Sequence, residues 1–100
     1  MAIFDTLKKT KLPCTYSHFM EPQQPPFIVY TGSGQNIFRA DDTHYYSRNT
    51  YTVEYYYKLK DETAESAIEA VLLGDGYQFT KSEDVYIEDE DVFVIYYYLN

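Results

Sequence analysis

Cys14 and His18 come closest, by residue type and spacing, to a reactive or metal-binding pair. They are four positions apart, and His44 is the other histidine of the chain. A structural zinc site usually takes four ligands, commonly supplied as close pairs. A nucleophilic cysteine needs a base placed against its thiol and usually a third group that orients the base. Three scattered candidates meet neither requirement, so the sequence predicts packing roles for them.

A glycine-containing loop, Thr31–Asn36 (TGSGQN), follows a short apolar stretch. Phosphate-binding loops also follow strands, but they carry a further glycine or a lysine and lead into a helix. This loop has none of these features. Glycine is common in tight turns for steric reasons, so the sequence predicts a hairpin or bulge loop here.

Carboxylates are densest near the C-terminus, in Glu83, Asp84 and the run Glu88-Asp89-Glu90-Asp91. A calcium loop would alternate its acidic residues with other residues and end on a trailing glutamate, and this pattern is absent. Four consecutive carboxylates cannot be buried unpaired, so the run is predicted to form a solvated turn. No metal, cofactor or catalytic residue is predicted anywhere in the chain.

Two tyrosine clusters, Tyr55–Tyr57 and Tyr96–Tyr98, have the chemistry to stack on nucleic-acid bases. Single-strand binders also need Lys and Arg along the backbone path. Here the neighbours are Glu54, Lys58 and an acidic half-chain. The clusters are therefore predicted to pack within a sheet or at an interface.

The bulk composition indicates one globular domain, residues 1–100, with 45% hydrophobic residues and thirteen tyrosines. A net charge of −8 argues against a generic nucleic-acid binder, which needs a basic surface. The single cysteine excludes an internal disulfide and fits a reducing cytoplasm. The longest apolar run is far below the roughly 20 residues of a membrane helix, and neither a signal peptide nor membrane binding is expected.

The helices and strands that must position these residues are predicted from the spacing of apolar residues and from the prolines and glycines that interrupt regular structure. A short helix is predicted over Ile3–Lys9, followed by an extended proline-rich connection, Leu12–Pro26. Strands are predicted at Phe27–Tyr30, ending at Thr31–Gly34, then in a hairpin (36–40 and 43–46) that turns at Asp41-Asp42, and at Tyr51–Lys58, Val85–Ile87 and Val92–Leu99.

The main helix is predicted over residues 61–73, with Asp61 as its N-cap. Its apolar stripe is Ala64, Ile68, Val71 and Leu72, and Gly74-Asp75-Gly76 ends it. Together these elements predict an α+β fold. It has a mostly antiparallel sheet of about four to five strands, with the main helix on one face and a short N-terminal helix.

Several strings resemble short head–tail connection proteins of long-tailed bacteriophages and prophages of Gram-positive bacteria. They are YSHFMEPQQPPFIVY, TGSGQNIFRADD, NTYTVEYYYKLKDE and KSEDVYIEDEDVFVIYY, and the most specific part is Pro25-Pro26-Phe27-Ile28-Val29-Tyr30. The order of elements is also similar to that of the tail terminator, or tail completion, family. That similarity is partly one of fold, and fold alone does not imply function.

The resemblance implies a virion structural protein at the tail–head junction, made in the host cytoplasm, and not an enzyme. Such subunits form a ring, typically a hexamer, that caps the tail tube and docks to the head. The implied partners are further copies of the chain, the tail tube protein and the head connector protein. DNA would pass through the ring as cargo without being bound specifically.

Surplus aromatic surface suits ring assembly, and the predicted subunit interface comprises Tyr16, Phe19, Tyr55, Tyr57, Tyr96 and Tyr98. An acidic channel wall would let DNA slide without sticking. The candidates for that lumen or surface are Asp41, Asp42, Glu83, Asp84, Glu88, Asp89, Glu90 and Asp91. On the closing strand, Tyr96 and Tyr98 are the aromatics expected on the face that the helix leaves open.

The alternative function is a small acidic phage protein that mimics DNA or otherwise inhibits a host protein. A mimic should spread carboxylates in phosphate-like rows over an elongated surface. Here long tyrosine-rich strands interrupt the acidic residues, so the structural function is preferred. An enzyme is disfavoured because no acid–base or nucleophile arrangement is recognisable.

Overall fold

The computed structural model describes the backbone of residues 3–39 and 45–99 and the side chains of residues 3–34 and 50–99. The chain order of the elements is α1 (Ile3–Lys8), β1 (Cys14–Tyr16), β2 (Phe27–Arg39), β3 (Tyr45–Tyr57), α2 (Glu62–Gly74), β4 (Phe79–Lys81), β5 (Val85–Ile87) and β6 (Val92–Leu99). None of the helices in this part of the chain has the length and apolar character needed to cross a membrane.

The strands form one six-stranded sheet in the order β1-β2-β3-β6-β4, with β5 also pairing with β6. β1 runs parallel to β2, and the other pairs are antiparallel. β3 pairs with β6 on one side, and on the other side β5 pairs with the beginning of β6 and β4 with its end. The α+β prediction is confirmed, and the sheet has six strands rather than four or five.

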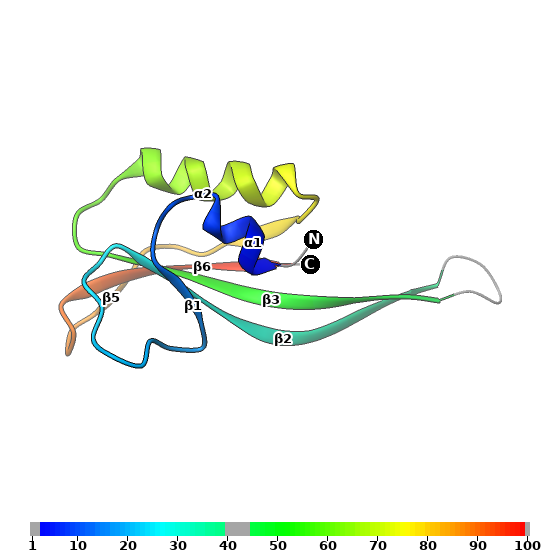
Figure 1. The fold of residues 1–100 in the computed structure, drawn as a ribbon, viewed down its shortest axis with the longest axis horizontal. Coiled ribbons are helices and arrows are strands. Elements are labelled where there is room, and N and C mark those ends of the chain that lie inside the picture. The colour runs from blue at the N-terminus through cyan, green and yellow to red at the C-terminus, as the bar shows by residue number, and fades with distance from the viewer. Residues whose placement is uncertain (1–2, 40–44, 100) are drawn as a thin grey trace.

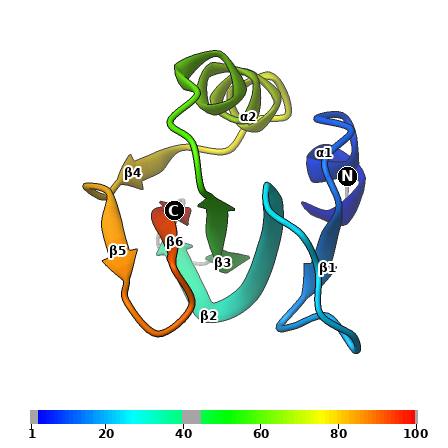
Figure 2. The ribbon, with the colours of Figure 1, turned by 90° about the vertical axis from the view of Figure 1, so that its left-hand side faces the viewer.

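Both helices lie on the same face of the curved sheet (Figures 1 and 2). α2 begins at the predicted cap, where the Asp61 carboxylate accepts hydrogen bonds from the amides of Thr63 and Ala64 at 3.0 and 3.2 Å. Its residues Ile68 and Leu72 are fully buried. They pack in a core with inward residues of the sheet, which include Val53, Tyr55, Tyr57, Ile95 and Tyr97.

The short helix α1 docks beside α2 and persists because it is held by the core. Ile3 and Leu7 are buried in the same cluster. Thr6 Oγ1 donates a hydrogen bond to Asp75 Oδ2 at 2.7 Å, and Lys9 Nζ lies 2.9 Å from Asp75 Oδ1. These two contacts fix the end of α2 to α1.

β2 and β3 are longer than predicted and form a ribbon that extends beyond the helices (Figure 1). The predicted stop at Thr31–Gly34 is wrong, because the strand continues through it to Arg39. The register shifts between Gly32 and Gly34, and Gly34 has a φ of +119°, so the glycines form a β-bulge. The predicted turn at Asp41-Asp42 lies outside the described residues, as does His44.

The β5–β6 hairpin carries the acidic run as its turn. The amide of Glu90 donates to the carbonyl of Ile87 at 3.2 Å, and Asp91 adopts the left-handed φ of +53° that a short acidic side chain tolerates. All four carboxylate residues of Glu88–Asp91 are exposed, as predicted.

Candidate functional site

The side of the sheet opposite the helices, which we call the outer face, is the main candidate surface. Alternation along each strand places Glu54 and Tyr56 of β3 on this face with Tyr96 and Tyr98 of β6. Tyr96 lies opposite Glu54 in the antiparallel register, and Tyr98 lies opposite Thr52. The outer face therefore combines aromatic surface with a carboxylate.

The aromatic side chains of the outer face are ordered by stacking. The rings of Tyr96 and Tyr98 lie 6.0 Å apart at 13°, and Tyr98 remains 46% exposed. Further along, Phe27 stacks on Tyr56 at 4.9 Å. The Tyr56 hydroxyl donates to Glu54 Oε1, and burial together with this hydrogen bond raises the pKa of Tyr56. Tyr56 is therefore a neutral donor and not a base.

Part of the outer face is already covered by the chain itself. The connection between β1 and β2 packs Phe19 edge-on against Phe27 at 5.3 Å. A groove of about 300 Å³ remains beside it, lined by residues that include His18, Phe19, Tyr56 and Glu90. The uncovered part of the outer face is thus the end that carries Tyr98.

Tyr55 and Tyr57 do not belong to the predicted subunit interface, and this prediction is corrected. They are 1% and 3% exposed and stack on each other under the helices at 5.4 Å. Their strand alternates, so the same alternation that buries them places Glu54 and Tyr56 outside. The sequence could have indicated Tyr56 as the outward residue only if the covered face had been known.

The other predicted interface residues have distinct places. Tyr16 is 57% exposed at the sheet edge formed by β1, where its ring packs edge-on against Tyr30 at 5.4 Å. Phe19 is half-buried within its own chain. Tyr96 is half-buried and Tyr98 exposed on the outer face, where the sequence placed them.

The predicted acidic residues, except Asp41 and Asp42, which lie outside the described residues, gather at one end of the sheet. Glu83 and Asp84 lie between β4 and β5, and the Glu88–Asp91 turn follows β5. Lys60 Nζ binds Asp84 at 3.1 Å, and the Tyr86 hydroxyl donates to Asp91 Oδ1 at 2.8 Å. Glu83, Glu88 and Asp89 are exposed.

A charge network under α2 was not predicted. The Glu65 side chain is 3% exposed, and its two oxygens lie 2.7 Å from Lys60 Nζ and 2.9 Å from Lys81 Nζ. Oε2 has no well-aligned hydrogen bond, but the Lys60 ammonium compensates its charge. Lys81 also contacts Glu69 at 2.8 Å, and the Tyr97 hydroxyl donates to Glu69 at 2.9 Å.

This network fastens the helix to the sheet and is unsuited to acid–base chemistry. The close ion pair with Glu65 raises the pKa of Lys60. Burial opposes the charge of Lys81, but hydrogen bonds to Glu69 and Glu65 outweigh it and raise that pKa as well. Burial raises the pKa of Tyr97, and the bond to Glu69 adds to the effect. Both lysines are locked as cations and the tyrosine as a neutral phenol, so none of these groups can act as a base near neutral pH.

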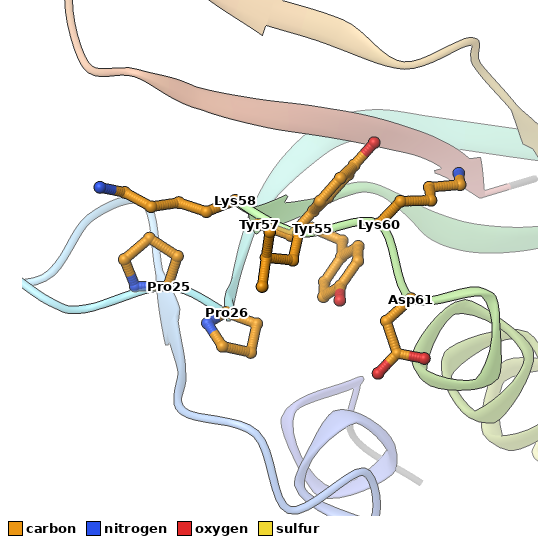
Figure 3. Close-up of a pocket in the computed structure, with 8 residues that line it drawn as sticks. Pro25, Pro26, Tyr55, Tyr57, Lys58, Lys60 and Asp61 are labelled. Carbon is orange, nitrogen blue, oxygen red and sulfur yellow. The ribbon is translucent and has the colours of Figure 1, made fainter.

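A pocket of about 450 Å³ opens where β2 begins, β3 ends and α2 starts (Figure 3). Pro25, Pro26, Tyr55 and Tyr57 supply its apolar lining, and Asp61 lies on its rim. The Asp61 carboxylate is occupied in capping α2. Burial, followed by a hydrogen bond to Asp84, raises the pKa of Tyr57 to about 12. The pocket can receive an apolar side chain but presents no paired acid and base.

Cys14 and His18 do not form a reactive pair. Burial raises the pKa of the Cys14 thiol although Lys8 partly opposes it, which keeps the sulfur protonated and weakly nucleophilic. His18 is exposed, and its Nδ1 lies 3.1 Å from Ser17 Oγ. The described residues contain no group of three or more metal-ligating side chains arranged around a common point.

The chain matches no known protein-family model and no curated protein sequence. Functional inference therefore rests on the surfaces described above and on the resemblance of its sequence strings.

Proposed function

We propose that the protein is a structural subunit of a bacteriophage head–tail connection. In this proposal several copies form a ring, with hexameric symmetry, that caps the tail tube and joins it to the head. Its partners are other copies of itself, the tail tube protein and the head connector protein. It acts at the tail–head junction of the virion by binding and positioning, without catalysis.

The observation that carries this proposal is the uncovered aromatic end of the outer face. Tyr98 is 46% exposed and stacked on Tyr96, while the helices cover the opposite face. Tyrosine combines a large apolar ring with a hydroxyl that tolerates water, and it is enriched at protein interfaces. A sheet with one helical layer leaves this surface for a neighbouring molecule.

The chemistry of the remaining side chains supports a role without catalysis. In the part of the chain that the structure describes, the buried charges are paired across the α2–sheet contact. The exposed carboxylates of Glu88–Asp91 stand in a hairpin turn. The net charge of −8 repels DNA, which suits a component that DNA must pass without adhering.

The alternative is a small acidic inhibitor that binds a host protein by mimicking DNA. Acidity favours it, but the carboxylates of residues 83–91 surround one end of the sheet and do not form rows along the molecule. An inhibitor needs only to bind its target, whereas a ring component must associate with itself or with a tube end.

The test is the mass of the chain in solution, measured by light scattering alone and with purified tail tube protein. The proposal predicts a complex that contains several copies of the chain for each tube end. A chain that remains monomeric and leaves the tube protein unbound would contradict it. Tight binding of a single copy to a host nuclease would favour the inhibitor.

A further inference from the structure

The two edges of the sheet differ in charge: exposed Lys8 and Lys11 outnumber exposed Asp5 at one edge, and carboxylates predominate at the other. Figure 2 shows α1 and β1 at one edge and β4 and β5 at the other, in agreement with the strand order. We call the first the basic edge and define it by Phe4, Lys8, Lys11 and Tyr16. The second, the acidic edge, is defined by Glu83, Val85, Tyr86, Glu88 and Asp89.

The basic edge offers both apolar surface and cations. Phe4 is 39% and Tyr16 57% exposed, and both rings pack against Tyr30, which holds them in place. Lys8 Nζ lies 5.6 Å from the centre of the Phe4 ring, and Lys11 is exposed after the helix. Lys9 is excluded from this surface because Asp75 already binds it.

The acidic edge has the complementary composition. Val85 is 38% and Tyr86 50% exposed, and the Tyr86 ring packs on Phe93 at 5.0 Å. Residues 82–91 contain six carboxylates and no lysine or arginine. Asp84 is bound by Lys60 and Asp91 by the Tyr86 hydroxyl, whereas no ion pair within the described structure engages Glu83, Glu88 or Asp89.

We infer that the basic edge of one copy docks against the acidic edge of the next copy. Contacts between like edges would place lysine beside lysine or carboxylate beside carboxylate, and such like-charge contacts disfavour association. Contacts between unlike edges pair the charges and bury the exposed rings of both. Because the two surfaces differ, the contact is heterologous, and repeating it generates a ring if the rotation closes.

The inference deepens the proposed function and rests on it, since it supplies the subunit contact of the ring. It also assigns the carboxylates of the acidic edge to that contact and not to the wall of the channel. The two lysines of the basic edge are too few for strong binding to nucleic acid, whose affinity grows with each phosphate neutralised. A second copy of the chain is therefore the partner that the charges fit.

The experiment is a charge exchange measured by sedimentation equilibrium of the full chain over a range of salt and protein concentrations. Lys8→Glu with Lys11→Glu makes both edges acidic, and Glu88→Lys with Asp89→Lys replaces two unpaired carboxylates of the acidic edge by lysines. We expect each double variant to lose self-association at least tenfold. Wild-type association should weaken as salt rises, because exposed charges are screened.

Two rescues follow from a head-to-tail contact. The quadruple variant exchanges the edges, keeps the net charge of −8 and should associate again. A mixture of the two double variants should also associate, with the copies alternating. Lys58→Glu is the matched control, since it reverses an exposed lysine just after the end of β3 that belongs to neither defined edge, and it should leave association within twofold.

Reversal of Lys8 also removes a favourable cation from the last turn of α1, so the unfolding midpoint is measured for each variant. The quadruple variant carries the same change, so recovery of its association cannot come from stability.

The inference is overturned if wild type never associates, or if neither rescue restores association. If the charge exchange has no effect but the chain still caps tail tubes, this contact is wrong and the proposed function stands. If the chain self-associates in a charge-dependent way but does not bind tail tubes, the proposed contact is retained and the head–tail function is rejected.

Discussion

At the scale of single residues, the burial of Glu65 was not predicted. The apolar stripe of Ile68 and Leu72 was predicted correctly, but Glu65 shares their buried side and is 3% exposed. A carboxylate is counted as outward in a hydrophobic pattern because burial is costly without a partner. The missed signal was Lys81, the single cation among eleven carboxylates between Asp61 and Asp91, with Lys60 just before them.

Glu65→Ala should lower the free energy of unfolding by about 2 kcal/mol, because it leaves two lysines at the helix–sheet contact without their shared carboxylate. Ser66→Ala is the matched control: it changes the exposed neighbour on the same helix and should stay within about 0.5 kcal/mol of wild type. Urea denaturation followed by circular dichroism measures both. Equal stabilities for the two variants would show that the buried network contributes nothing.

The tyrosines show that strand alternation indicates which residues share a face of the sheet but not which face the helices cover. Strand alternation groups Tyr55 with Tyr57 and Tyr96 with Tyr98, and both groupings are correct. Which group faces the helices depends on the pairing between β3 and β6, and their register is set by contacts distant in sequence. Tyr96 and Tyr98 were therefore placed correctly, whereas Tyr55 and Tyr57 were assigned to the wrong face.

At the scale of elements, local sequence signals predicted the ends of α2 correctly. They failed for β2, where strand pairing overrides them. Asp61 and Gly74 bounded the helix to within one residue because caps act locally. The glycines at Gly32 and Gly34 also looked like a stop, yet pairing with β3 carries the strand through them as a bulge. Sheet pairing is a long-range interaction, so composition alone could not distinguish a bulge from a turn.

β1 is the clearest case of an element without a sequence signature. Cys14–Tyr16 spans three residues in a proline-rich stretch, and it pairs in parallel with Ile28–Tyr30. Parallel neighbours are usually joined by a helical crossover of a dozen or more residues. Here residues 17–26 make the connection without a helix. The segment was predicted as an extended connection, and its strand pairing was missed.

Adjacent residues of β6 separate the folding role of this strand from its proposed binding role. Tyr97 is fully buried, so Tyr97→Ala should destabilise the fold by about 4 kcal/mol. Tyr98 lies on the outer face, and Tyr98→Ala should cost less than about 1 kcal/mol while weakening binding to tail tube protein tenfold. Thermal unfolding and a pull-down on tail tubes give the two readouts. Unchanged tube binding by Tyr98→Ala would remove the outer face from the proposed interface.

At the scale of the whole molecule, the chain is elongated, and its charge is distributed unevenly between the two edges of the sheet. It extends 50 × 24 × 24 Å, with the β2–β3 ribbon projecting beyond the helices (Figure 1). The acidic edge and the basic edge flank the same sheet (Figure 2). Composition predicted an acidic, tyrosine-rich α+β protein, but it could not show that the charges segregate to opposite edges, because that arrangement depends on strand order.

We propose that copies of this chain form a ring on the end of a tail tube. The most direct measurement is electron microscopy of purified tail tubes polymerised with and without the chain. We expect a ring-shaped density at one end of each tube and an end to elongation once the ring is in place. Tubes of unchanged length with bare ends, and the chain left unbound in solution, would contradict it.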